Sequence, residues 1–515
     1  DQDGRDREFV CSSERFHESN QSIAQELSSL GLRIMPGKER ELRKYLRGFV
    51  LPEAYRRRCV DRTGWVNVET PLYVLPNQVI GLDQKEPVIF QPEAHSPVVL
   101  TMHKKGSLDQ WHAFVVRPCI GNPYLLFSLC ASYASPLLKH LRMDCGGFHF
   151  YGASSRGKTT LLQVAASSWG CGIDPASGDN SFVGRWNSTG NAFEATASAH
   201  NDGILLLDEM GTCSASNFGA LIYGLFGGEG KKRLNKQSGL RSTRSWRILA
   251  LSTGELSTSQ RISEEAGRKA MAGQLVRMAD IPINNGIIID THGKASDEFV
   301  TELKYNCGEY YGVSAPLFIE GLVGLSSSSE ALTNTLRTLV DAAEGELLAG
   351  LNLESCQRRV VKRFAMVVVA GWLSIRFNII RCEGREVMES VRAVMMDWLG
   401  DNSNIPEGQR GLEAVKNFIL RNPDRFRPIG NENSSVRNLA GFLDTGIGLY
   451  LLTTEGLAEA CAGFNKDMVL SELDRLDFLM TGEEGRMNRK FTVRGVGRTR
   501  LYGIREGLLG HDYAD

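Results

Sequence analysis

The sequence predicts an α/β protein with a parallel sheet at its core, and three observations lead to that prediction. The segment Gly152-Ala153-Ser154-Ser155-Arg156-Gly157-Lys158-Thr159 follows an apolar run and precedes a helix-forming stretch. Residues 203–211, GILLLDEMG, form a second apolar run that ends in two carboxylates. Strand-like and helix-like segments alternate over residues 146–290, as in a sheet covered by helices. The predicted strands are 147–151, 184–188, 203–208, 246–252 and 276–283.

Length and composition limit the class of protein. A chain of 515 residues exceeds one compact core, so we expect about two to four domains. The hydrophobic content of 42% and the charged content of 23% are ordinary for a soluble globular protein. The net charge is −1, so any nucleic-acid site must be a local basic patch.

Cysteine usage and hydropathy predict a cytoplasmic protein. The eleven cysteines form no C-x-x-C pair and no Cys/His cluster, which argues against structural zinc and for a reducing compartment. The apolar run from Phe364 to Leu373 is too short to span a bilayer, and no signal peptide is visible. We therefore expect no contact with a membrane.

The regions before the core differ in composition. Residues 1–62 are predicted to form a helical, partly disordered N-terminal segment. Residues 63–145 contain short alternating runs rich in Val, Pro, Thr and Gly, which predict a β-rich region. The last part of this region is rich in small and apolar residues and is expected to be a helical lead-in to the core.

The segment from Gly152 to Thr159 has the pattern G-x-x-x-x-G-K-[ST] of a phosphate-binding loop, or P-loop. Its glycines let backbone N–H groups turn toward phosphate oxygens, and the following helix adds its dipole. Lys158 reaches the terminal phosphates, and the Thr159 hydroxyl is placed to bind Mg²⁺. We predict binding of ATP with Mg²⁺ through Gly152, Ala153, Ser154, Ser155, Arg156, Gly157, Lys158, Thr159 and Thr160.

Asp208 and Glu209 stand at the end of a predicted buried strand. Asp208 can hold Mg²⁺ through water, and Glu209 can polarise an attacking water. The alternative is a helix N-cap on a solvated turn. Downstream of a complete P-loop, the pair favours nucleotide hydrolysis, with Glu209 and Asp208 as catalytic residues and Asp208 and Thr159 as metal ligands.

A stretch with basic but no acidic side chains follows the two carboxylates. Residues 230–254 contain no acidic residue, and basic arms flank a central QSG, which predicts a β-hairpin. Such a hairpin favours contact with a polyanion, whereas the alternative is a solvated loop. The residues predicted to bind DNA are Lys231, Lys232, Arg233, Lys236, Arg241 and Arg244.

Two further positions are candidates for the catalytic site. The strand after the hairpin ends in Ser252 and Thr253, and a hydroxyl there would lie beside Lys158 and the acidic pair. Thr253 is the preferred candidate and Ser252 the alternative. Arg277 enters a predicted strand and could serve a neighbouring subunit's nucleotide; Arg268 is the weaker candidate, and a salt-bridged surface arginine is the alternative for both.

The rest of the chain contains a lid and a small module. Residues 291–400 are predicted to be mostly helical, residues 401–411 to be a linker, and residues 412–515 to be a small α+β module. In that module Asn465 can cap a helix, and a basic alternating stretch turns at Gly495-Val496-Gly497. Helix plus basic wing predicts a winged-helix-like module that binds DNA phosphate through Arg494, Arg498 and Arg500, with protein docking as the alternative.

Four segments of the core resemble the bacterial family DUF927, a domain of unknown function, in their sequences and in their order along the chain. They are FHFYGASSRGKTTLLQVAASSWG, RWNSTGNAFEATASAHNDGILLLDEMG, WRILALSTGE and AGQLVRMADIP. Members of this family are helicase-like and common on plasmids, prophages and other mobile elements. The resemblance spans roughly residues 60–380.

The resemblance implies an AAA+-like P-loop ATPase of the hexameric helicase type. It implies that Lys158, Thr159, Asp208, Glu209 and Thr253 act within one subunit, that Arg277 acts on the next one, and that Arg363 contacts ATP from the lid. The implied function is a ring-forming replicative helicase of a mobile genetic element, with single-stranded or forked DNA as partner. The alternative is a non-translocating AAA+ switch or protein remodeller, whose hairpin would be apolar or aromatic; a small-molecule P-loop kinase would not need the additional domains.

Overall fold

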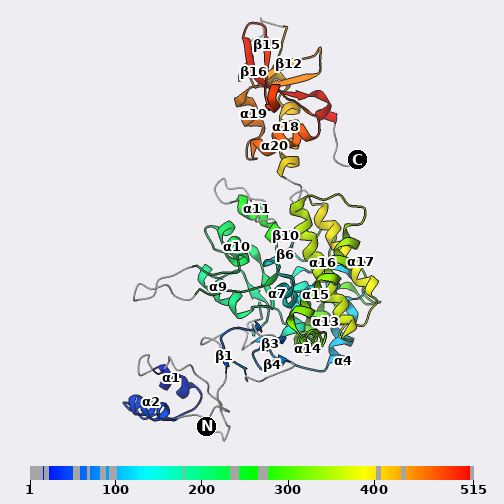
Figure 1. The fold of residues 1–515 in the computed structure, drawn as a ribbon. Coiled ribbons are helices and arrows are strands. Elements are labelled where there is room, and N and C mark those ends of the chain that lie inside the picture. The colour runs from blue at the N-terminus through cyan, green and yellow to red at the C-terminus, as the bar shows by residue number, and fades with distance from the viewer. Residues whose placement is uncertain are drawn as a thin grey trace. The chain divides into compact units, whose positions relative to one another are not determined.

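The protein divides into two compact units, Asp1–Gly400 and Asp401–Asp515 (Figure 1). Each unit has a hydrophobic core of its own. The structure, a computed structural model, describes residues 16, 22–49, 58–66, 70–81, 88–91, 101–177, 180–231, 243–264, 276–401, 407–430 and 436–510. The boundary between the units falls at the start of the predicted linker 401–411. Helix α18 begins at Glu407, so the second half of that segment is helical rather than a linker.

The first unit is built around five parallel strands in the order β10-β6-β9-β8-β7. The core is therefore the predicted α/β parallel sheet. Numbered along the chain, the spatial order is 5-1-4-3-2, so the strand after the P-loop helix does not pair with the P-loop strand. The strands are β6 (Gly146–Tyr151), β7 (Gly184–Arg185), β8 (Ile204–Asp208), β9 (Leu249–Gly254) and β10 (Met278–Pro282).

Two strands differ from their predicted ranges. Strand β7 is two residues long instead of 184–188, because the chain turns away after Arg185. Strand β9 begins at Leu249 rather than at Trp246. The Trp246 backbone N–H donates to the Gly228 carbonyl at 2.9 Å and so closes the base of the preceding loop instead of joining the sheet.

Both faces of the sheet are buried, which explains its continuous apolar runs. Alternate residues of β8 pack into different cores: Leu206 into the larger core of the unit, and Leu207 into a second core with α9 and α10. Figure 1 shows α9 and α10 on one side of the sheet and α13 to α17 on the other. The helices that follow the strands directly are α8 (Lys158–Trp169), α9 (Gly190–Ala199), α10 (Phe218–Phe226) and α11 (Thr258–Ser263).

The apolar run at 364–373 lies in the middle of α16 and is buried in the larger core. Phe364 packs against Phe148 of β6 and Phe127 of α6, at ring centroid distances of 4.8 and 5.7 Å. Among the residues that the structure describes, no helix has the length and apolarity needed to cross a bilayer. The helices of this region are α13 (Ser296–Glu309), α14 (Ser314–Gly324), α15 (Ser329–Leu348), α16 (Ser355–Arg376) and α17 (Gly384–Leu399).

The segments before the sheet contain short strands and then helices. Strands β2 (Gly64–Trp65), β3 (Leu72–Leu75) and β4 (Gln78–Gly81) form an antiparallel sheet, and β1 (Arg58–Val60) pairs in parallel with β5 (Val88–Phe90). The helical elements here are α1 (Ser22–Ser29), α2 (Glu39–Arg47), α4 (Leu108–Trp111), the π-helix η3 (His112–Val116), α5 (Arg117–Cys119), α6 (Pro123–Ser132), η4 (Ser135–Leu137) and α7 (Leu138–Leu141).

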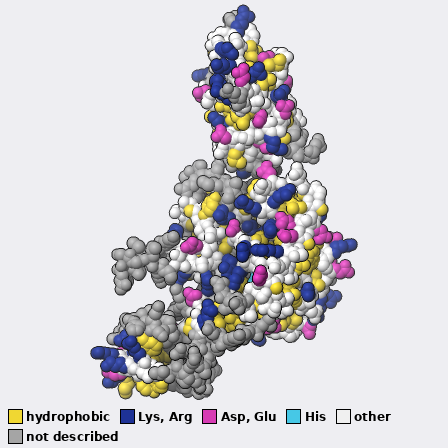
Figure 2. Space-filling view, in the orientation of Figure 1, with side chains coloured by type: hydrophobic (Ala, Val, Ile, Leu, Met, Phe, Trp, Pro, Cys, Tyr) yellow, Lys and Arg dark blue, Asp and Glu magenta, His cyan; other side chains and the backbone are white. Residues whose placement is uncertain are grey.

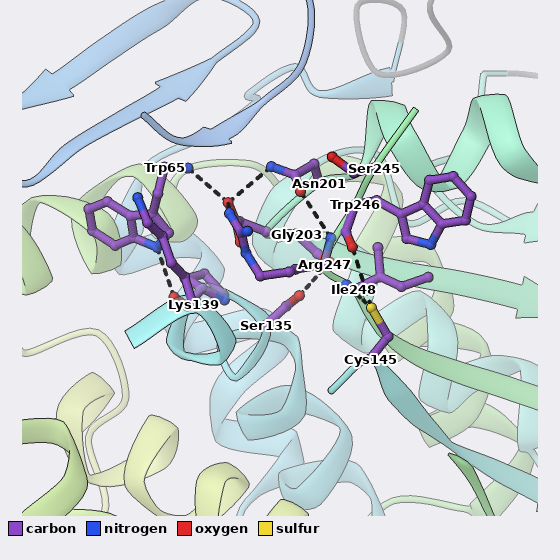
Figure 3. A network of polar contacts seen from close by, with 12 residues as sticks. Trp65, Ser135, Lys139, Cys145, Asn201, Gly203, Ser245, Trp246, Arg247 and Ile248 are labelled. Carbon is purple, nitrogen blue, oxygen red and sulfur yellow. Dashed lines mark hydrogen bonds and ion pairs between the residues drawn. The ribbon is translucent and has the colours of Figure 1, made fainter. Parts of the chain in front are cut away.

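Strand β2 is fastened to the core by the fully buried carboxylate of Asp202, which stands just before β8. Figure 3 shows Trp65 and Arg247 near Asn201, the residue that precedes Asp202. This carboxylate accepts a hydrogen bond from the Trp65 backbone N–H at 2.9 Å and pairs with Arg247 Nε at 2.6 Å. Gly64 has a φ of +98°, and a Cβ there would lie 2.5 Å from Asp202 Oδ2. Only glycine therefore fits between β2 and this ion pair.

Replacing Arg247 by alanine is expected to lower the free energy of unfolding by about 3 kcal/mol, because the Asp202 charge stays buried without its counter-ion. This value is at the low end of what breaking a buried ion pair costs, because 32% of the Arg247 side chain remains exposed. Urea denaturation followed by tryptophan fluorescence measures the loss. The matched control is Arg62→Ala, which removes two exposed hydrogen bonds, to the carbonyl and the hydroxyl of Ser245, and should cost about 1 kcal/mol or less. Equal losses in the two variants would show that the buried ion pair contributes no more to the free energy of unfolding than the exposed hydrogen bonds of Arg62.

The second unit combines three helices with a six-stranded sheet. The predicted cap is confirmed: Asn465 Oδ1 accepts from the Asp467 backbone N–H at 3.0 Å. The order helix, strand, two helices, hairpin is compatible with a winged-helix-like module, which stays a prediction; strands β11 and β12 are an addition. The elements are α18 (Glu407–Arg421), η7 (Pro423–Arg425), β11 (Phe426–Pro428), β12 (Gly441–Asp444), β13 (Leu449–Leu452), α19 (Thr454–Ala460), α20 (Lys466–Arg475), β14 (Leu479–Met480), η8 (Glu483–Gly485), β15 (Arg489–Val493), β16 (Gly497–Arg505) and η9 (Glu506–Gly510).

Candidate active site

The P-loop connects β6 to α8 at the carboxyl edge of the sheet. Gly152 and Gly157 have φ values of +146° and +83°, which side chains rarely adopt. A Cβ at Gly157 would also lie 2.8 Å from the Ile287 side chain. Lys158 Nζ donates to the carbonyls of Gly152 at 2.8 Å and Ala153 at 2.6 Å, so its ammonium group lies over the loop. This is the position from which it can reach terminal phosphates.

The carboxylate of Asp208 lies next to the first turn of α8. The residue is 4% exposed, and the Thr159 hydroxyl donates to its two oxygens at 3.3 and 3.2 Å. Burial raises the pKa of Asp208, whereas the hydrogen bonds from Thr253 and Thr159 lower it. A carboxylate and a hydroxyl at this distance form an oxygen-donor set that suits Mg²⁺.

Thr253 connects the two acidic residues. Its hydroxyl donates to Asp208 Oδ1 and accepts from the Glu209 backbone N–H at 3.2 Å. Glu209 is exposed at the end of β8, and its φ of +56° is left-handed, which is unusual for a residue with a side chain. Thr253 thus holds the Asp208 side chain while supporting the turn that carries Glu209 into the cleft.

Ser252, the alternative to Thr253, lies on the other side of β9. Its hydroxyl accepts from Trp186 Nε1 at 2.8 Å and contacts His149 Nδ1 at 2.9 Å. Burial lowers the pKa of His149 to about 4, so the ring is neutral near pH 7. Since His149 Nε2 lies 2.9 Å from the Leu256 carbonyl, it must carry the proton, and Ser252 donates to Nδ1. Ser252 therefore joins three segments under the site and does not face the nucleotide.

A cleft of about 470 Å³ lies at the ends of β6, β8 and β9, and its lining includes Lys158, Thr159, Asp208, Glu209 and Thr253. The cleft is also lined by three charged side chains that the sequence motifs did not indicate, Glu255, Arg261 and Lys304. The Ser154 hydroxyl donates to Glu255, and Arg261 donates to the Cys213 carbonyl at 3.3 Å. Glu255 follows β9 directly, so its place at the cleft could have been predicted from the sequence. Arg261 and Lys304 lie on α11 and α13, where no local motif indicates a role.

Arg363 does not lie in this cleft, which corrects the expectation that it contacts ATP. Its guanidinium covers Gly146, at the opposite end of β6 from the P-loop, and donates to the Val276 carbonyl at 3.1 Å. The side chain is only 5% exposed, and burial lowers its pKa to about 10. Helix α16 packs along the larger core, and its register directs Arg363 to the starting edge of the sheet.

Arg277 lies at the same starting edge, immediately before β10. Its guanidinium stacks over the ring of Tyr223 at 4.6 Å. It is remote from the cleft of its own subunit, so any catalytic role must concern a neighbouring one. Arg268 lies outside the described residues.

The predicted basic hairpin is described only at its base. Glu229 and Ser245 form an antiparallel bridge, and the Gly230 N–H donates to the Arg244 carbonyl at 2.8 Å. Lys231 and Arg244 therefore lie on two segments that run antiparallel at this base. Lys232, Arg233, Lys236 and Arg241 lie outside the described residues.

The residues at the cleft fit a nucleoside triphosphate with its metal ion. The left-handed glycines open the loop, and the Lys158 ammonium group lies over it. Burial lowers the pKa of Lys158, while Glu255 and Asp208 raise it. A phosphate group would therefore meet a partly desolvated cation, and the Thr159 hydroxyl and Asp208 carboxylate at the first turn of α8 could bind Mg²⁺.

Comparison with known proteins gives a family match and a similar fold. The family model of a domain of unknown function, DUF927, matches residues 1–245, a region that begins earlier and ends sooner than the expected 60–380. Among solved structures, SCCmec type IV Cch, described as an active helicase, has a TM-score of 0.70 at 19% identity; the match covers 96% of this chain and 88% of that one. At this identity the likeness shows the fold alone. No curated protein matches the sequence.

Proposed function

Residues 1–245 match the DUF927 family model, and on that premise we propose that the chain is an ATP-driven DNA translocase. In this proposal it is a ring-forming helicase of the hexameric AAA+ type that replicates a mobile genetic element. The observation that carries the proposal is the convergence of Lys158, Asp208, Glu209 and Thr253 at one cleft. The 5-1-4-3-2 strand order makes this possible, because it inserts β9 between the P-loop strand and the acidic strand.

The chemistry assigned to the cleft is hydrolysis of ATP. Lys158 balances charge on the terminal phosphates, and the Glu209 carboxylate orients the attacking water. Thr253 keeps Asp208 and Glu209 in their relative positions. Mg²⁺, held by the Thr159 hydroxyl and through water by Asp208, would neutralise charge on the phosphate oxygens.

The choice of DNA over a protein substrate depends on the basic hairpin. Residues 230–254 contain seven basic side chains and no acidic one, whereas a hairpin that pulls on protein chains would be apolar or aromatic. The similar fold of Cch, described as an active helicase, is in line with this choice as an analogy of fold. The rival function is a non-translocating AAA+ switch or protein remodeller.

The test is ATP hydrolysis by the full chain with and without single-stranded DNA, together with unwinding of a forked duplex and particle images of the assembly. We expect DNA to raise the hydrolysis rate several-fold, roughly as expected for a motor whose conformational steps are coupled to its track. The images should show closed rings. Hydrolysis that ignores DNA and is stimulated by an unfolded protein would favour the remodeller.

A further inference from the structure

The β15–β16 hairpin of the second unit separates its side chains into two faces. Lys490 pairs directly with Arg500, and Thr492 with Arg498, so these four side chains share one face. All four are exposed. The opposite face carries Val493 and Leu501, which are 1% and 2% exposed and pack into a small core. The exposed face, defined here as the outer hairpin face, is therefore not needed for folding.

The charged side chains of this outer hairpin face all carry positive charge, and Arg500 Nη1 donates a hydrogen bond to the uncharged Asn488 Oδ1 at 3.1 Å. Like charges in directly paired positions of neighbouring strands destabilise a hairpin, and Lys490 and Arg500 form such a pair. No ion pair joins Lys490, Arg498 or Arg500 to a carboxylate among the side chains that the structure describes. From Gly485 to Arg505 the sequence has seven basic residues and no Asp or Glu. An external anion is the partner that would relieve this repulsion.

Two helices of the same unit, α19 and α20, have a net negative charge. The exposed side of α20 carries Asp467, Ser471 and Asp474, and α19 exposes Glu455. Arg475, the basic residue at the end of α20, is paired with Glu472 at 2.7 Å. A helix that enters the major groove passes between two rows of phosphates, so this acidic side would be repelled. Figure 2 shows Lys and Arg side chains gathered over β15 and β16.

We propose that the outer hairpin face, with Lys490, Arg498 and Arg500, binds the phosphate backbone of DNA without reading its sequence, and that α20 stays outside the groove. The inference rests on the proposed function for the identity of the polyanion. It goes further than the predicted wing contact by adding Lys490, which pairs with Arg500, and by excluding the helix that a winged-helix-like module would use for base recognition. Binding of this kind is expected to depend on salt and not on base composition.

The experiment measures fluorescence anisotropy of labelled duplexes of two unrelated sequences with the full chain, without nucleotide, across a salt series. For Lys490→Ala/Arg498→Ala/Arg500→Ala we expect equal weakening on both duplexes and a log–log salt slope flatter by about 2–3, since three phosphate contacts are lost. The matched control is Arg505→Ala, on the same strand but paired with Asp477 at 3.3 Å, which should change the slope little. Basal ATP hydrolysis should equal that of the wild type in both variants.

A second variant tests the helix. Ser471→Glu adds negative charge to the exposed side of α20 and should leave the affinity within about twofold, whereas a helix seated in the groove would lose most binding. Wild-type binding with an unchanged triple variant, or loss of binding in Ser471→Glu, overturns the inference and leaves the proposed function standing. A wild-type chain that binds neither duplex nor single strands contradicts both.

Discussion

Glu209→Gln is expected to lower kcat for ATP hydrolysis about 10³-fold while nucleotide binding persists. The amide keeps the size of the side chain and the backbone hydrogen bond from the Glu209 N–H to Thr253. It removes the carboxylate that polarises the attacking water, so the loss falls on the chemical step and not on affinity. Phosphate release under saturating ATP gives kcat, and titration with a fluorescent ATP analogue gives the Kd.

Lys158→Ala is the control for this prediction, because it removes the ammonium group over the P-loop and should abolish binding as well as turnover. The two variants thus separate chemistry from affinity. If the Glu209→Gln protein hydrolyses ATP at the wild-type rate, Glu209 is not the catalytic residue, and another group at the cleft must orient the attacking water.

Arg277→Ala is expected to lower hydrolysis about 10³-fold with ATP binding intact, since an arginine supplied by a neighbour stabilises charge on the transferred phosphoryl group. The position of Arg277 at the starting edge of the sheet excludes its own cleft as the target. Thermal unfolding should match that of the wild type to within a few degrees, which separates a catalytic loss from the loss of stacking on Tyr223.

Mixing the two inactive proteins tests the assignment between subunits. In mixed rings, an intact Glu209 in the Arg277→Ala subunit meets an intact Arg277 of the Glu209→Gln subunit, so part of the activity should return. The amount should peak near equal proportions. If subunits exchange but no ratio restores hydrolysis, Arg277 has a structural role only.

Much of the core could be predicted because its motifs stand at strand ends. The P-loop follows β6, Asp208 ends β8, and Thr253 is near the end of β9. Carboxyl ends of parallel strands share one edge of a sheet, so local patterns were enough to expect these residues to lie together. Neighbouring strand residues face opposite sides, so only one of Ser252 and Thr253 can face the cleft, and the structure shows Thr253 there.

The helical residues could not be placed in this way. Arg363 and Lys304 both lie on helices that follow the sheet, yet Lys304 lines the cleft and Arg363 covers the far end of β6. The periodicity of a helix shows which residues are buried but not which end of the sheet the helix reaches. That depends on packing between α16 and the larger core, which is a long-range property of the chain.

The left-handed backbone of Glu209 has a consequence for the balance between stability and activity. A side chain in this conformation costs on the order of 1 kcal/mol relative to glycine, and the hydrogen bond from its N–H to Thr253 helps to hold it there. A glycine would relax the turn but would remove the carboxylate. At this position the residue best suited to the fold and the residue best suited to hydrolysis are therefore different amino acids, and the chain keeps the second.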